Sequence, residues 1–117
     1  MPDPQDPETF RRSRLDWSEP AAEPHARLLA WYRDLLALRK AEPDLRDPRL
    51  DRVDVTWSDQ RLDTTRGSFR VLVNLADDAW SCAADGEVVL AWEPGVQVAA
   101  GSVDVPARSA VLLRISV

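Results

Sequence analysis

The sequence predicts a mainly β chain, with an antiparallel β-sandwich of about seven or eight strands preceded by an extended loop and one long amphipathic α-helix. Three observations support this. Apolar residues recur at helical spacing over 24–42. From residue 51 onward apolar and polar residues alternate, as in half-buried strands. Turn signals divide this second region at intervals of roughly 8 to 10 residues, as expected for a sandwich or barrel.

We expect four consecutive parts, because a chain of 117 residues is long enough for one domain with a core and an appendage. Their boundaries follow from the prolines and from the change of apolar period. The parts are an extended proline-rich loop over 1–23, an amphipathic helix over 24–42, a linker over 43–50 and a C-terminal β-sandwich domain over 51–117.

The segment 1–23 shows no apolar periodicity. Four of its residues are proline, which lacks the backbone N–H that helices and sheets use. Its largest apolar side chains, Phe10, Leu15 and Trp17, would stay in contact with water unless something covers them. We therefore predict a loop that lies on a larger body.

The segment 24–42 contains PHARLLAWYRDLLALRKA, which predicts an amphipathic helix. Pro24 suits the first helical position, and Pro43 forces Glu42 out of the α region and ends the helix. At 100° per residue, an arc of about 180° is apolar, which is wider than the roughly 100° needed against one partner. The helix is therefore expected to pack against two bodies. The arc consists of Leu28, Leu29, Trp31, Tyr32, Leu35, Leu36 and Leu38.

The part from residue 51 onward is a series of short strands, of which 68–75 is expected to be the most buried. Asp85-Gly86 is the strongest signal for a two-residue hairpin, and Pro94-Gly95 suits a type II turn. The predicted strands are 51–57, a run beginning at Leu62, 68–75, 80–85, 87–92, 96–100, 103–105 and 109–117. The turn signals between them are Ser58-Asp59, Arg66-Gly67, Asp77-Asp78, Asp85-Gly86, Pro94-Gly95, Gly101-Ser102 and Pro106.

Composition argues against several classes of function. The net charge of −5 and the lack of a basic cluster argue against a nucleic-acid surface. Cys82 is the single cysteine, so no intrachain disulfide can form. The N-terminus lacks the basic and apolar regions of a signal peptide, and no apolar run approaches the roughly 18 residues of a membrane span. The expected location is therefore the cytoplasm.

The residues also argue against most catalytic sites. His25 is the single histidine, which excludes a His-based triad, and we interpret it as a packing or polar residue of the first helical turn. Cys82 lies in a predicted strand and is interpreted as an inert core thiol. No spacing typical of a metal site occurs, and we expect no cofactor. Arg39 points into the apolar arc near the helix C-terminus, where a cation suits the dipole, so it should be buried and paired.

Two further residue classes deserve a chemical interpretation. A glycosidase needs two carboxylates that flank the scissile bond, but six of the carboxylates here fall in the N-terminal loop or at turns, where Asp bonds the local backbone. These are Asp3, Asp6, Asp16, Asp77, Asp78 and Asp85. Of the five tryptophans, Trp57, Trp80 and Trp92 lie in the strand region and could form a platform for sugar rings, although core or interface packing is the more frequent role.

The motif PDPQDPETFRRSRLDW at 2–17, followed by HARLLAWYRDLLALRK at 25–40, resembles the C-terminal part of malto-oligosyltrehalose trehalohydrolases, in the α-amylase superfamily of glycoside hydrolases. The first motif is the specific one. The second resembles the last helix of the superfamily's (β/α)₈ barrel, which leads into a β-sandwich domain. Residues 70–78 and 105–113 resemble segments of such sandwich domains, so the resemblance covers nearly the whole chain.

The resemblance implies a C-terminal fragment whose sandwich supports the barrel. Similar enzymes release trehalose from maltooligosyltrehalose with an Asp nucleophile and a Glu acid on earlier barrel strands, so we expect no catalytic residue here and no activity of the chain alone. Gln5 and Asp6 would contact substrate in the full enzyme only. The residues expected to face the barrel or an interface are Phe10, Trp17, Leu28, Trp31, Tyr32, Leu35 and Arg39.

The expected partner is the catalytic barrel of the same enzyme, with α-glucan as a candidate ligand. Two alternatives stay open: a stand-alone α-glucan-binding module, and a protein-interaction module that docks or self-associates through the exposed helix face. Met1 stands where the family pattern has an apolar residue, often Val, and a GTG codon for Val can serve as a bacterial start. We therefore expect the DNA upstream to encode barrel strands.

Overall fold

The computed structural model describes residues 3–115, so the predictions for Met1 and Val117 lie outside the described residues. The chain divides into two compact units, Met1–Asp34 and Leu35–Val117, and the division falls inside the helix α2 (His25–Ala41). Among the described residues, no helix has the length and apolar composition needed to cross a bilayer.

The N-terminal unit is less extended than the sequence predicts, because it contains the helix α1 (Pro7–Arg12) and the 3₁₀ turn η1 (Glu19–Ala21). The Asp6 carboxylate caps α1 by accepting a hydrogen bond from the Glu8 N–H at 2.9 Å, and Pro7 occupies the first turn. Apolar periodicity does not reveal α1 because none of its residues is buried. Local capping chemistry, rather than packing, therefore specifies this helix.

The long helix α2 begins and ends within one residue of its predicted bounds. Pro24 was expected at the first helical position but lies one residue before it, since α2 begins at His25. Its carbonyl accepts the first hydrogen bond of the helix, from the Leu28 N–H at 3.3 Å. Glu42, which precedes Pro43, is extended (φ −103°, ψ 115°), as proline requires of its neighbour.

The apolar arc of α2 is only partly covered. Leu28 is 46% exposed, Tyr32 59% and Leu36 54%. Arg39 lies in the same stripe of the helix surface and is exposed as well, so the prediction that it is buried was wrong. The position of a residue on the helical arc does not determine whether another segment packs over it, and among the described residues Arg39 stays accessible to solvent. The half-buried members of the arc are Leu29, Trp31, Leu35 and Leu38.

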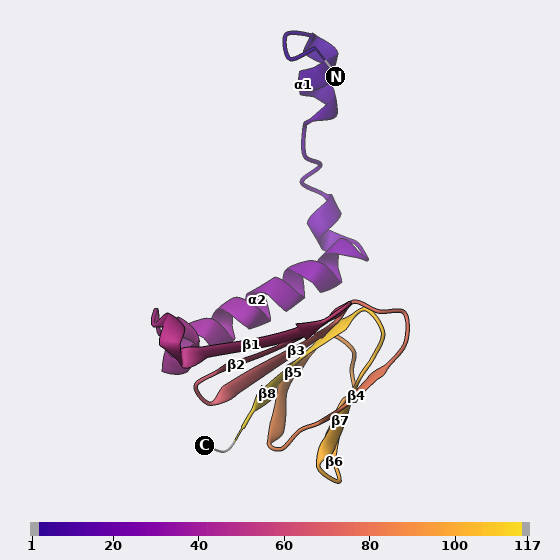
Figure 1. The fold of residues 1–117 in the computed structure, drawn as a ribbon. Coiled ribbons are helices and arrows are strands. Elements are labelled where there is room, and N and C mark those ends of the chain that lie inside the picture. The colour runs from indigo at the N-terminus through magenta and orange to yellow at the C-terminus, as the bar shows by residue number, and fades with distance from the viewer. Residues whose placement is uncertain (1–2, 116–117) are drawn as a thin grey trace. The chain divides into compact units, whose positions relative to one another are not determined.

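The C-terminal unit contains eight strands in two antiparallel sheets, which confirms the predicted fold class (Figure 1). The larger sheet has the order β1-β2-β3-β8-β5 and the smaller one the order β4-β7-β6. The strands are β1 (Val53–Ser58), β2 (Arg61–Arg66), β3 (Phe69–Asn74), β4 (Trp80–Ala83), β5 (Glu87–Ala91), β6 (Val98–Ala99), β7 (Ser102–Val105) and β8 (Ser109–Arg114). Each corresponds to a predicted strand.

The predicted hairpin at Asp85-Gly86 was wrong, because β4 pairs with β7 while β5 pairs with β8. The chain crosses from one sheet to the other at this point. Gly86 has φ +107°, and a Cβ atom there would lie 2.1 Å from the Arg114 carbonyl oxygen. Glycine is therefore needed for close approach to the end of β8 rather than for a two-residue turn.

The core lies between the two sheets and is formed by alternate residues of their facing surfaces. Leu72, Val111 and Leu113 of the larger sheet and Val103 and Val105 of β7 are all at most 1% exposed. Leu75, the last residue of the predicted strand 68–75, is 65% exposed, because β3 ends at Asn74. β8 has more buried positions than β3, which was expected to be the most buried strand.

Cys82 packs at the margin of this core and is half-buried. Burial raises the pKa of its thiol, because the thiolate would lose its hydration, and the nearby Arg70 only partly opposes this. A raised pKa reduces the thiolate fraction, which agrees with the interpretation of Cys82 as an inert thiol.

The segment that follows α2 is attached to the larger sheet by polar contacts. The Asp44 carboxylate, in the 3₁₀ turn η2 (Pro43–Arg46), accepts hydrogen bonds from the Ser68 N–H at 2.8 Å and the Ser68 hydroxyl at 2.6 Å. Glu42 pairs with Arg114 at 2.6 Å, and the Asp47 carbonyl accepts a hydrogen bond from Arg66. A third short turn, η3 (Leu50–Arg52), leads into β1.

These contacts predict a pH dependence of stability. The bonds from Ser68 lower the pKa of Asp44 below its usual value, so this carboxylate stabilises the fold above the unfolded-state pKa of about 3.9, and the contribution is lost as pH falls through the folded-state pKa. Asp44→Asn should lower the urea midpoint at pH 6, and its difference from the unaltered chain should shrink by pH 2.5. The control is Asp59→Asn, in the turn between β1 and β2. An equal difference at both pH values would contradict the prediction.

Candidate functional site

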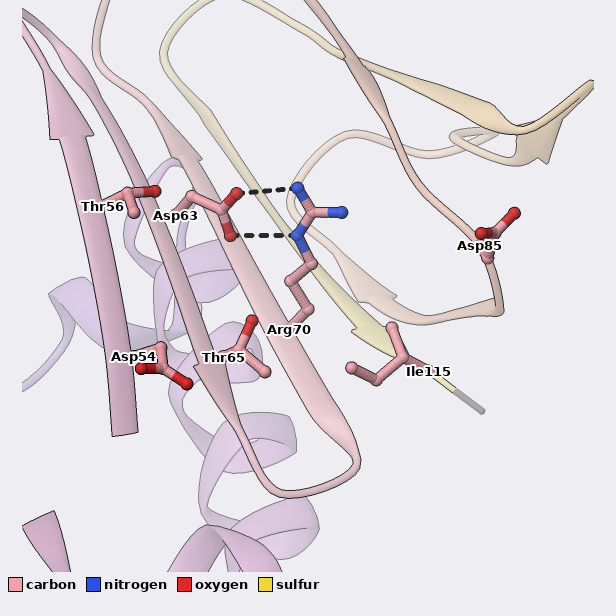
Figure 2. Close-up of a pocket in the computed structure, with 7 residues that line it drawn as sticks. All are labelled: Asp54, Thr56, Asp63, Thr65, Arg70, Asp85 and Ile115. Atoms are coloured by element: carbon pink, nitrogen blue, oxygen red, sulfur yellow. Dashed lines mark hydrogen bonds and ion pairs between the residues drawn. The ribbon is translucent and has the colours of Figure 1, made fainter. Parts of the chain in front are cut away.

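The larger sheet extends beyond the smaller one, and the face that forms the core turns polar over β1 and β2. The register places Asp54 opposite Thr65 and Thr56 opposite Asp63, on the same face as Arg70 of β3. These five residues line a hollow of about 410 Å³ together with Asp85 and Ile115 (Figure 2). Asp85 lies across the hollow from β1 and β2, in the segment that connects β4 to β5.

Asp63 and Arg70 form a two-bonded ion pair in this hollow. Arg70 Nε lies 3.0 Å from Asp63 Oδ1, and Nη2 lies 2.7 Å from Oδ2. The third nitrogen, Nη1, donates to the Ala83 carbonyl at 2.7 Å, which connects the larger sheet to the end of β4. The hydrogen bonds between Asp63 and Arg70 hold the two charged groups in a fixed orientation. The same bonds raise the pKa of the Arg70 guanidinium. Asp63 is thus occupied as an acceptor and poorly suited to act as a base.

A second hollow, of about 240 Å³, adjoins the first because both are lined by Thr56 and Asp63. It adds Trp57 and Ser58 of β1, Arg61 of β2 and Trp80 of β4. We call the two hollows together the β1–β2 groove.

Two tryptophans of the β1–β2 groove differ in exposure. Trp57 is 77% exposed on the edge strand β1. Trp80 is half-buried and packs against the core, and the Arg61 guanidinium lies 5.9 Å from the centre of its ring. Arg61 also pairs with Asp78 at 3.0 Å, so its position is fixed from two sides. By the strand register, Trp57 lies with Leu62 on the opposite face of the larger sheet from Thr56 and Asp63, so the aromatic ring beside the polar groups of the groove is that of Trp80.

The N-terminal unit has an apolar hollow of about 340 Å³ between the segment before α2 and the first turns of α2. Trp17, at 84% exposed, and Leu28 and Tyr32 present large apolar surfaces here. His25 is exposed in the first turn of α2 and also lines this hollow. We call this surface the N-terminal apolar surface, lined by Leu15, Trp17, Pro20, His25, Leu28, Leu29 and Tyr32.

The other predicted site residues are dispersed. Asp6 caps α1, and the Gln5 N–H donates to the Asp3 carboxylate at 2.9 Å, so both have local contacts. Phe10 is 71% exposed on α1. Trp31 and Leu35 are half-buried on α2. Whether these residues contact substrate or a barrel remains a prediction.

The three tryptophans proposed as a sugar platform do not gather in one place. Trp57 and Trp80 share a hollow, whereas Trp92 follows β5, which forms the opposite edge of the larger sheet from β1. Sequence reasoning did not predict Arg61, Thr56 or the Asp63–Arg70 pair. The predicted turn at Ser58-Asp59 lies one residue before the observed loop, Asp59-Gln60, and would have placed Thr56 opposite Arg61 instead of Asp63.

The candidate groups suit binding rather than hydrolysis. Within residues 3–115, no group of three or more His, Cys, Asp or Glu side chains is arranged to hold a metal ion. Asp63 is engaged by Arg70, while Asp54 and Asp85 are exposed on different sides of the hollow. The arrangement can donate and accept hydrogen bonds, which a recognition surface requires.

Comparison with known proteins identifies relatives along almost the whole chain. No protein-family model matches it. A malto-oligosyltrehalose trehalohydrolase of Mycobacterium tuberculosis is 41% identical over 116 residues, which are 97% of this chain and 20% of that protein. The enzyme of the same name from Brevibacterium helvolum is 43% identical over 117 residues, and that from Arthrobacter ramosus is 47% identical over 92 residues, 79% of this chain.

A solved structure supports the same relationship. A Salmonella typhimurium protein that carries the provisional name alpha amylase matches with a TM-score of 0.73 and 25% identity, over 98% of this chain and 20% of that one. The chain thus spans about a fifth of the length of the curated relatives it matches. By sequence and fold, it belongs to the malto-oligosyltrehalose trehalohydrolase family and corresponds to a C-terminal part of those enzymes.

Proposed function

We propose that this chain acts as the non-catalytic C-terminal part of an α-glycosidase that releases trehalose from malto-oligosyltrehalose, and that it supports the catalytic domain of that enzyme. The observation that carries the proposal is the match of 97% of the chain to only 20% of the Mycobacterium tuberculosis and Brevibacterium helvolum relatives. The two-sheet fold and the engagement of Asp63 by Arg70 support a structural role.

The N-terminal apolar surface is the proposed contact with the catalytic domain. Trp17, Leu28 and Tyr32 are each about half exposed or more and line one apolar hollow. Burying one such side chain stabilises a complex by roughly 1.5 to 3 kcal/mol, and a monomer rarely exposes several together. The rest of the enzyme, which accounts for about four-fifths of each relative, is the proposed cover for this surface.

A chimeric enzyme tests this function. The C-terminal fifth of the Brevibacterium helvolum relative would be replaced by this chain, and trehalose release from malto-oligosyltrehalose would be measured. We expect the chimera to release trehalose, whereas the relative without its C-terminal fifth, and this chain alone, should release none. Trehalose release by the purified chain would contradict the non-catalytic role, and a folded but inactive chimera would contradict the supporting role.

Substitutions on the N-terminal apolar surface should lower trehalose release by the same chimera. In the assembled chimera, Leu28→Asp combined with Tyr32→Asp would place two charges where the catalytic domain covers two apolar side chains. We expect at least a roughly tenfold loss of active enzyme. Leu75→Asp is the matched control, because Leu75 is 65% exposed and is not one of the residues of this surface. Equal losses for the control and for the double variant would show that the surface has no special role.

A further inference from the structure

We propose that the outer face of the larger sheet, opposite the core, is a second contact with the catalytic domain, and that Trp57 is its central anchor. We call the exposed part of this face the outer apolar row, which consists of Val55, Trp57, Leu62 and Val73. The identity of the partner rests on the proposed function, whereas the surface itself is argued from the strands of the C-terminal unit.

The strand register defines the outer apolar row. Leu72 of β3 belongs to the core, so its neighbour Val73 points to the outer face. Val73 lies opposite Leu62 of β2, and Leu62 lies opposite Trp57 of β1, so one line of apolar side chains crosses three strands. Val55 precedes Trp57 by two residues and extends the row along the edge strand β1.

The row is exposed although its residues are apolar. Trp57 is 77% exposed, Val55 45% and Leu62 38%. Elsewhere on the same face, Phe69 is 0% and Leu112 6% exposed, so the outer face is covered in one part and open in another. Single exposed apolar residues are common on a soluble protein, but a contiguous row of them marks an interaction surface.

The segment that leads into the sandwich is fixed to this outer face. Arg66 and Arg114 lie on the outer face, because both are in register with Phe69. Arg114 pairs with Glu42 at 2.6 Å, and Arg66 donates a hydrogen bond to the Asp47 carbonyl. In a longer enzyme, the domain that precedes this segment is thus tethered to the outer face, and tethering raises the effective concentration of that domain there.

The size and polarity of the row favour a domain of the same chain over a separate protein. The exposed side chains carry no charge, as is typical of the core of an interface. An aromatic side chain buries about 150 to 250 Å², so the row falls short of the roughly 800 Å² per partner that a stable complex of separate chains needs. It suffices as one part of a tethered interface, of which the N-terminal apolar surface is the other proposed part.

The test compares the chimera with the isolated chain of 117 residues. Trp57→Asp should lower trehalose release by the chimera at least about tenfold, because a charge would replace the aromatic side chain that the catalytic domain covers. The isolated chain should unfold in urea at nearly the same midpoint with and without this substitution, since Trp57 is exposed there. Trp57→Phe, which keeps an aromatic side chain, should retain most of the trehalose release.

Ser58→Asp is the matched control, because Ser58 is the next residue of β1, is also exposed and lies on the opposite face of the sheet. It should leave trehalose release unchanged. No loss in Trp57→Asp, or an equal loss in Ser58→Asp, would overturn the contact.

Urea unfolding of the chimera separates this inference from the supporting role. A folded chimera that releases no trehalose but is destabilised by Trp57→Asp overturns the supporting role alone. A chimera that releases trehalose and keeps both its activity and its stability in Trp57→Asp overturns this inference alone. A chimera that does not fold contradicts both.

Discussion

Gly86→Ala is expected to lower the free energy of unfolding by about 3 kcal/mol or more. The added Cβ would lie 2.1 Å from the carbonyl oxygen of Arg114 and 3.0 Å from its carbonyl carbon, and both are backbone atoms that cannot rotate away. The φ of +107° is itself unfavourable for alanine, at roughly 1 to 3 kcal/mol. Overpacking adds about 1 to 3 kcal/mol more, because β8 is held between β3 and β5 in the larger sheet and cannot shift freely.

Gly95→Ala is the matched control for this prediction. Gly95 also has a positive φ, of +80°, but no atom lies within 4 Å of the Cβ position. Gly95→Ala should therefore lower the free energy of unfolding only by the cost of the positive φ, roughly 1 kcal/mol. Urea unfolding followed by tryptophan fluorescence measures both variants. Similar losses at the two positions would mean that the contact with Arg114 contributes nothing.

Gly86 also shows the limit of reading turns from sequence. Asp85-Gly86 carries the local signal of a two-residue hairpin, and strands do lie on either side of it. The partner of Gly86 is the end of β8, almost thirty residues later, and no local pattern contains that information. The strands were therefore predictable from alternation and turn residues, whereas their distribution between two sheets was not.

The same distinction applies to α2 and to the candidate sites. The ends of α2 follow from Pro24 and Pro43, which act within a few residues of themselves. The exposure of Arg39 depends on what packs over the helix. The helical wheel does not contain that information, so the prediction that Arg39 is buried was wrong. Arg61 and Trp80 meet only because β4 of the smaller sheet lies near β2, which the sequence pattern does not specify.

Asn74→Ala is the second variant expected to have a large effect, at about 3 kcal/mol. Asn74 is completely buried at the end of β3. Its amide nitrogen donates to the carbonyl oxygens of Asp78 at 2.8 Å, Pro106 at 3.1 Å and Val105 at 3.2 Å, and its oxygen accepts from the Ala76 N–H at 3.1 Å. One side chain thus joins β3, the segment after it and the end of β7 in the other sheet.

The magnitude follows from the groups that the substitution would leave behind. A buried donor or acceptor without a partner costs roughly 1 to 3 kcal/mol, and alanine would leave several carbonyls and one N–H without a partner at once, only some of which water can reach.

Ser109→Ala is the matched control. Ser109 pairs with Asn74 in the sheet register and is 4% exposed, yet within residues 3–115 its hydroxyl has no hydrogen-bond partner. Removing that hydroxyl should change stability by less than about 1 kcal/mol. A loss in Ser109→Ala as large as that in Asn74→Ala, measured by urea unfolding, would attribute the effect to packing at this position rather than to the hydrogen bonds that join the two sheets.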